Sequence, residues 1–141
     1  MYRIKIFSIG KTKETWLLDA ISEYEKRLKA IMPIEWIFTK NNEQLRLLLD
    51  KEFFFVALVP SAKEVTSEQF ANSLYLWLER FGCRLSFVIG GAEGIPEDLA
   101  EKAFQTLSLS KLTFTHQIAR LILIEQIYRA TEIHKGSEYH K

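Results

Sequence analysis

Short apolar segments alternate along the whole chain with longer segments in which apolar residues recur every three or four positions. The first pattern is typical of β-strands, and the second is typical of α-helices that bury one face. Strands that alternate with helices usually form a mainly parallel sheet with helices packed on it. The sequence has no repeat, low-complexity segment or linker. We therefore expect a single α/β domain, residues 1–141, with a mainly parallel sheet flanked by helices.

The apolar spacing also predicts where the individual elements lie. Strands are expected over residues 2–9, 34–38, 53–59, 85–89 and 107–109. Helices are expected over residues 17–31, 45–49, 66–81, 96–104 and 116–133. Thr66 and Gln69 have the spacing of a capping box, and Pro96 suits the first turn of a helix.

Composition narrows the class of protein further. The chain has 141 residues and 48% hydrophobic residues, enough for a core that needs no disulfide or metal. Its formal charge of +1 argues neither for strong electrostatic RNA binding nor against a local basic patch. The single cysteine, Cys83, is interpreted as a buried or half-buried structural thiol, and metal-ligand spacings are absent. The chain starts with alternating apolar and polar residues and has no long apolar run, so we expect no signal peptide and no membrane span. The expected location is therefore the cytoplasm.

The last predicted helix is apolar on nearly all its faces. A surface helix keeps one face polar, so this pattern predicts apolar partners on two sides. In so small a domain we expect the second partner to be another subunit, which gives a homodimer. The apolar positions are Ile118, Ala119, Leu121, Ile122, Leu123, Ile124, Ile127, Tyr128 and Ala130.

A glycine-rich turn follows the buried strand at 85–89. Gly90, Gly91 and Gly94 do not have the spacing of the dinucleotide-binding fingerprint. Two interpretations stand at this point. The glycines let a ligand approach the backbone at the carboxyl end of a strand, or they serve only a tight turn.

Two further segments allow both a functional and a structural interpretation. Residues 108–115 are hydroxylic and partly apolar, which suits an adenine ring, yet Thr115 also suits a plain helix cap. Glu125 and Arg129 have the spacing of a surface ion pair, although Arg129 can also face RNA phosphate. All three histidines lie in the last helix or beyond it, and the chain ends in residues 138–141, Glu-Tyr-His-Lys. That ending is either a frayed terminus or a proton-transfer element.

Taken together, these segments resemble one family, the small single-domain SPOUT methyltransferases. The resemblance is to those that methylate N3 of a pseudouridine in large-subunit ribosomal RNA. It covers essentially the full chain and is most specific after Phe87. The segments that carry it are 4–6, 10–11, 87–94, 107–114, 116–117, Arg120, 125–130 and 139–141.

The resemblance implies a C-terminal trefoil knot, an obligate homodimer and S-adenosylmethionine as the methyl donor. By position, the cofactor would contact Leu58 and Gly90, together with the loop formed by Leu109, Ser110, Lys111, Leu112, Thr113 and Phe114. Two positions depart from the family pattern. Thr115 stands where many relatives have proline, and residues 59–62 replace an acidic or glycine-bearing turn.

The resemblance also implies the chemistry of the tail. We expect His140 to handle the N3 proton, Tyr139 to position or stack on the base, and Arg129 to orient the tail or the RNA. In a dimer we expect the tail to reach the cofactor held by the other subunit, and we expect the assembled ribosome to be the substrate. Two alternatives remain open: a non-catalytic ribosome-binding module on the same fold, and a flavodoxin-like nucleotide-binding domain.

Overall fold

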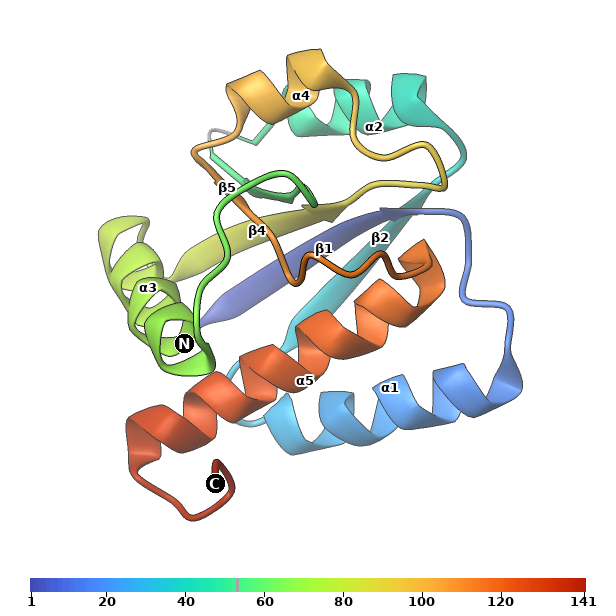
Figure 1. The fold of residues 1–141 in the computed structure, drawn as a ribbon. Helices are drawn as coiled ribbons and strands as arrows, with labels where there is room; N and C mark the ends of the chain where they lie inside the picture. Colours follow the sequence, from blue (N-terminus) through green and yellow to red (C-terminus); the bar gives the residue numbers. More distant parts are fainter. Residues whose placement is uncertain (53) are drawn as a thin grey trace.

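The computed structural model describes residues 1–52 and 54–141 and shows strands and helices in alternation (Figure 1). Along the chain they are β1 (Arg3–Ile9), α1 (Thr15–Leu28), β2 (Ile34–Thr39), α2 (Asn42–Leu49), β3 (Val56–Leu58), α3 (Ser67–Arg80), β4 (Arg84–Ile89), α4 (Glu97–Lys102), β5 (Gln105–Leu107) and α5 (His116–Lys135).

The five strands form one sheet in the order β2-β1-β4-β3-β5, and every neighbouring pair is parallel. Parallel neighbours need crossover connections, and the helices supply them. The predicted α/β class with a parallel sheet is therefore confirmed.

The alternation of side chains along each strand divides the core between the two faces of the sheet. Ile6 of β1 and Phe87 of β4 point to the face that carries α1, α3 and α5. Phe7 and Val88 point to the opposite face, where α2 and α4 pack. The first face holds the larger core, because three helices cover it along its length.

Some element boundaries differ from the sequence predictions. Helix α1 ends at Leu28, and Ile31, the last residue of the predicted helix, is 40% exposed in the turn before Pro33. Strand β3 is shorter than the predicted 53–59, of which Phe53 lies outside the described residues. The last strand ends at Leu107 instead of continuing to 109, because the amide of Ser108 donates to Lys63 O, away from the sheet.

Local capping signals are confirmed. Thr66 and Gln69 form the capping box of α3. The Oγ1 of Thr115 accepts a hydrogen bond from the amide of Ile118 at the start of α5. Gly136 ends α5 in the left-handed conformation at φ 77°, which lets the tail turn back along the helix. Cys83 is half-buried, as expected.

Helix α5 finds apolar partners within its own chain for all its predicted apolar positions except Ile118 and Ile122, which are half-buried. It packs against the sheet and between α1 and α3 (Figure 1). Its fully buried apolar positions are Leu123, Ile124, Ile127 and Ala130. The apolar circumference of α5 therefore does not by itself require a second subunit, and the homodimer stays a prediction.

The expected knot also stays a prediction, although the segments concerned cross in Figure 1. Residues 59–66 run beside residues 107–111: the amide of Val59 donates to Leu107 O, and the amide of Ser108 donates to Lys63 O. Among the described residues, none of the helices has the length and apolarity to cross a bilayer.

Candidate active site

A small cleft lies at the carboxyl ends of β3 and β4, the position where open parallel sheets bind ligands. Its volume is about 100 Å³. The lining residues are Leu58, Val59, Pro60, Ile89, Gly90, Gly91, Gly94, Leu109, Ser110, Leu112, Phe114, His116 and Ala119. Six of the eight positions that the resemblance assigned to the cofactor line this cleft. The other two, Lys111 and Thr113, are exposed on the same loop but do not line it.

Gly90 is required by the turn itself. A Cβ atom at this position would lie 2.5 Å from the carbonyl carbon of Gly94 and 2.6 Å from the amide nitrogen of Ile95. At Gly91, the atoms nearest to a Cβ would be those of the Ile9 side chain, at an ordinary 3.6 Å. The tight-turn interpretation is thus supported, and the turn at the same time forms one wall of the cleft.

Polar contacts fix the loop on the other side of the cleft. The Oγ of Ser110 accepts from the amide of Leu112 at 3.0 Å. The amide of Lys111 donates to Oε2 of Glu64 at 3.1 Å, which ties the loop to the segment after β3. With its backbone held in this way, the loop presents Leu109, Leu112 and Phe114 as an apolar wall.

His116, the first residue of α5, also lines the cleft, and the sequence analysis did not place it there. Burial lowers the pKa of His116, and the positive charges of Arg120 and Lys13 lower it further. The imidazole is therefore neutral at pH 7. The one feature of the sequence that could have indicated this position is that His116 directly follows the hydroxylic segment 108–115.

Arg120 is fully buried in the first half of α5 and connects this helix to the end of β1. All five of its N–H groups have acceptors. Nε donates to Ser8 Oγ at 2.9 Å, and Nη1 donates to Thr12 Oγ1 and Gln117 Oε1. Nη2 donates to the carbonyl oxygens of Ile9 and Gly10, both at 2.7 Å.

Only hydroxyl, amide and carbonyl oxygens stabilise the charge of Arg120. In the part of the chain that the structure describes, no carboxylate pairs with it. Its guanidinium carbon lies 5.0 Å from the centre of the Phe38 ring, a cation–π contact. Burial lowers the pKa of Arg120 to about 10, so it remains protonated at neutral pH.

The three predicted catalytic residues come together at the other end of α5. Arg129 donates to both carboxylate oxygens of Glu125, at 3.3 and 2.8 Å, and Nη1 of Arg129 lies 2.9 Å from Nδ1 of His140. The Tyr139 hydroxyl donates to Oε2 of Glu125 at 2.9 Å. The predicted Glu125–Arg129 pair is confirmed, and the tail is folded onto the helix instead of frayed.

The surroundings of Tyr139 keep its hydroxyl protonated. Burial raises the pKa of Tyr139, and hydrogen bonds to Tyr24 and Glu125 raise it further. Its ring packs edge-on against Tyr128, with centroids 4.8 Å apart, and the Arg129 guanidinium lies over it at 5.0 Å. In this arrangement Tyr139 donates a hydrogen bond, and its ring already has partners.

The cleft and the tail cluster lie far apart within one chain. His116 and Arg129 are separated by 13 positions on one helix, which corresponds to about 20 Å at the helical rise of 1.5 Å per residue. Figure 1 shows the C-terminal tail at the opposite end of α5 from the loop that precedes it. A single chain therefore presents two halves of a candidate site that do not meet.

The parallel sheet, with a cleft at its strand ends and an adjacent hydroxylic loop, defines an α/β protein with a candidate ligand site at that edge. The family model described as "Predicted SPOUT methyltransferase" matches residues 2–140. A relative from Protochlamydia amoebophila, strain UWE25, named ribosomal RNA large subunit methyltransferase H, is 53% identical over 141 residues, 100% of each chain. The chain thus belongs to the SPOUT methyltransferase family.

Solved structures of low sequence identity share the fold. A methylase family protein from Haemophilus influenzae Rd KW20 has a TM-score of 0.59 at 9% identity, covering 99% of this chain and 70% of its own. A methyltransferase from Legionella pneumophila, in complex with the bound cofactor SAM, has a TM-score of 0.52 at 10% identity, covering 92% and 66%. At these identities the likeness supports the fold alone.

Replacing Arg120 with Lys should lower the free energy of unfolding by about 3 kcal/mol, because the carbonyl groups of Ile9 and Gly10 lose their donors. Urea unfolding of the two proteins measures the difference. Arg27→Lys is the matched control, since Arg27 is exposed and its pair with Glu23 lies on the surface. Equal, small losses in both variants would show that Arg120 is not the anchor of α5.

The free energy of unfolding should fall as the pH drops below the unfolded-state histidine pKa of about 6.5. His116 resists protonation in the folded chain because its pKa is lowered, so below this pH the unfolded state binds more protons. His116→Gln should lose less stability than the wild type between pH 7.5 and 5.5 in urea titrations. If His116→Gln and the wild type lose the same free energy of unfolding between these two pH values, His116 is not the group that makes stability depend on pH.

Proposed function

We propose that this protein transfers a methyl group from S-adenosylmethionine to N3 of a pseudouridine in large-subunit ribosomal RNA. The observation that carries the proposal is the full-length, 53% identical relative whose name gives large-subunit ribosomal RNA as the substrate. The cleft at the strand ends supports it, because it lies where an α/β fold binds a nucleotide-like ligand.

The chemistry of the cleft fits this methyl donor. Leu58, Leu109 and Leu112 provide apolar walls for an adenine ring, and the glycine turn provides backbone groups for its edge. Bound there, S-adenosylmethionine supplies a methyl group on a positively charged sulfur. The lining suits that charge, since its only ionisable side chain in the described part of the chain is His116, which is neutral at pH 7.

The tail provides the groups that act on the target base. His140 accepts the N3 proton, which has to leave before or during attack on the methyl group. Before the substrate binds, Arg129 donates to Nδ1 of His140 and thereby sets the orientation of the ring. Tyr139, with its raised pKa, serves as a hydrogen-bond donor that positions the base instead of taking its proton.

One contact of His140 has to be exchanged when the substrate binds. Arg129 has only donors, so Nδ1 accepts, and Nε2 then carries the hydrogen that faces Oε1 of Glu68 at 3.0 Å. Both ring nitrogens are therefore occupied in the folded tail. Only Nδ1 has a lone pair for the N3 proton, so the contact with Arg129 is the one that the base has to replace, while Nε2–H keeps facing Glu68.

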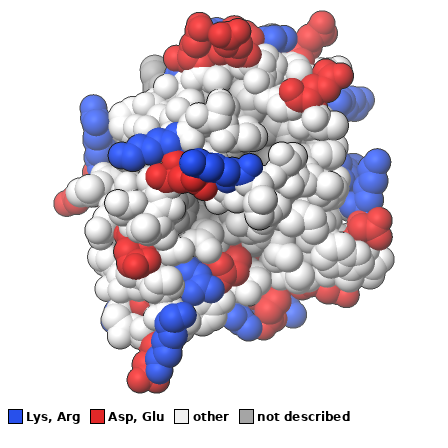
Figure 2. All heavy atoms as spheres, in the orientation of Figure 1, with Lys and Arg blue, Asp and Glu red and all other residues white. Residues whose placement is uncertain are grey.

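The distance of about 20 Å along α5 between cleft and tail supports an active site shared by two subunits. In the proposed homodimer, the tail of one subunit reaches the cleft of its partner. The surface around the start of α5 suits such an interface, since Figure 2 shows a largely uncharged area over the first half of this helix.

The small net charge also bears on the form of the substrate. A formal charge of +1 gives little general attraction to naked RNA. The assembled ribosome or its large subunit, which adds shape and protein contacts, is therefore the proposed substrate, and the cytoplasm the proposed location.

Leu112→Ala should weaken S-adenosylmethionine binding about tenfold, because part of the apolar wall is removed. Its exposure means that the fold is little affected. Isothermal calorimetry measures the affinity. Leu47→Ala is the matched control, since Leu47 on α2 is 68% exposed and lies outside the cleft. The cofactor site is elsewhere if both variants bind like the wild type.

His140→Ala should lower methylation of large ribosomal subunits at least about a hundredfold while S-adenosylmethionine affinity stays intact. Mass analysis of the ribosomal RNA, including RNA from cells that lack the protein, measures the single methyl group. Retained activity in this variant would remove His140 from the mechanism. A wild-type protein that binds ribosomes but transfers no methyl group would indicate a non-catalytic module instead.

Mixed dimers distinguish a shared site from a site within one chain. Ala119→Leu should fill the cleft of about 100 Å³ and block the cofactor without touching the tail. Dimers that combine this variant with His140→Ala regain activity only if the tail of one subunit serves the cleft of the other. Inactive mixed dimers, formed from folded chains, would place cleft and tail of each site in one subunit.

A further inference from the structure

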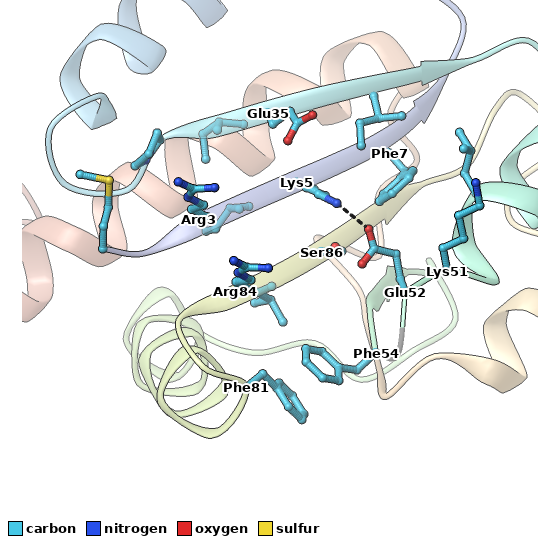
Figure 3. A pocket seen from close by; sticks show the side chains of 17 residues that line it. Arg3, Lys5, Phe7, Glu35, Lys51, Glu52, Phe54, Phe81, Arg84 and Ser86 are labelled. Carbon is cyan, nitrogen blue, oxygen red and sulfur yellow. Dashed lines mark hydrogen bonds and ion pairs between the residues drawn. The ribbon is translucent and has the colours of Figure 1, made fainter.

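A second, larger concavity lies on the face of the sheet that carries α2 and α4 (Figure 3). Its volume is about 910 Å³, within the range of ligand sites. We call it the sheet groove, and its charged lining residues are Arg3, Lys5, Glu35, Lys51, Glu52 and Arg84. It exists because α2 and α4 pack on the apolar second halves of the strands and leave the polar first halves of β1 and β4 uncovered.

Two arginines stand side by side in this groove. Arg3 of β1 and Arg84 of β4 are direct partners in the parallel register, on strands about 4.8 Å apart. Figure 3 shows both guanidinium groups on the same face of the sheet. Like charges directly opposite each other destabilise a sheet, so this arrangement has a cost for folding.

Nothing in the described part of the chain neutralises this pair. Neither Arg3 nor Arg84 forms an ion pair there. Lys5, by contrast, is paired with Glu52 at 2.9 Å. The carboxylate of Glu35 faces the same groove beside Lys5, away from Arg84 (Figure 3). The uncompensated charge is therefore concentrated at the end of the groove where β1 and β4 begin.

Aromatic rings adjoin the arginines at that end. Phe54 and Phe81 are stacked with their centroids 3.6 Å apart. The guanidinium of Arg80 lies 5.4 Å from the centre of the Phe81 ring, which adds a third cation nearby. Paired cations beside flat apolar rings are the combination that single-stranded nucleic acid uses, with phosphates on the cations and bases on the rings.

We propose that the sheet groove binds a single-stranded segment of the substrate RNA, with Arg3 and Arg84 on its phosphates. This inference rests on the proposed function. Arginine matches phosphate with two parallel hydrogen bonds, and the open groove allows an extended chain to pass. An acidic peptide fits less well, because it would pair with the arginines but leave the Phe54 and Phe81 rings unused, whereas the bases of RNA can contact those rings.

The groove acts as an anchor and takes no part in the chemistry. Arg84 begins β4, whereas the cofactor cleft follows its last residue, Ile89. Six residues of strand span about 20 Å. The double variant Arg3→Gln/Arg84→Gln should therefore raise KM for large ribosomal subunits about tenfold and leave kcat and S-adenosylmethionine affinity unchanged. The slope of log affinity against log salt should decrease by about 1.4, for two lost phosphate contacts.

The matched control removes two other positive charges. Lys26 and Lys29 are exposed at the end of α1, which covers the other face of the sheet. Lys26→Gln/Lys29→Gln should keep the wild-type KM and salt slope. Equal effects of the two double variants would attribute binding to overall charge and overturn the proposal, as would a wild-type KM for Arg3→Gln/Arg84→Gln.

A binding measurement tests the groove independently of methyl transfer. In NMR titrations, octauridylate should shift the signals of Arg3, Phe81 and Arg84 in the wild type, and inorganic phosphate at equal phosphate concentration should shift them less. Groove signals that respond to polyglutamate but not to octauridylate would overturn RNA as the ligand. If octauridylate binds in the groove but the wild type methylates no ribosomal RNA, the proposed function is wrong, whereas the assignment of the groove as a site for single-stranded RNA is supported.

Discussion

The buried guanidinium of Arg120 fixes α5 against the end of β1, and both parts of the candidate active site depend on the position of this helix. Its five donors are satisfied by backbone carbonyls and neutral side chains. A buried charge without a carboxylate is costly unless every donor has a partner. The arrangement is therefore rigid, since any shift of α5 would break several of these bonds together. His116 at one end of the helix and Arg129 toward the other are positioned by one anchored element.

Local features of the sequence predicted the elements, while contacts between distant segments decided their ends. The side chains of Thr66 and Thr115 cap the two helices that they were expected to start. The predicted end of β5 was wrong. The strand ends earlier because the amide of Ser108 donates to Lys63 O instead of to a neighbouring strand. Residues 45 positions apart decide this contact, and no periodicity within either segment contains it.

The candidate site was predictable to a similar extent. The resemblance pointed to the cleft lining, but the i, i+4 spacing of Glu125 and Arg129 indicated only a surface pair. Gly136 turns the chain back, so that His140 reaches the same guanidinium. The role of Arg120 had one visible signal, a lone cation within the apolar stretch 118–124. A charged residue at such a position has to find polar partners elsewhere in the chain, and the sequence does not say which.

The alternation of side chains in β1 also explains why the sheet has different chemistry at its two ends. Arg3, Lys5 and Phe7 point to one face, so a single strand passes from an uncovered polar region to a packed apolar one. The helices that pack on that apolar half leave the two arginines of the groove open to solvent. The candidate cofactor cleft lies at the opposite ends of the strands, beyond the packed half. Because the two regions share no partners and lie about 20 Å apart, substitutions in one should act independently of those in the other. A protein of this size can then hold an RNA segment at one end and carry out chemistry at the other.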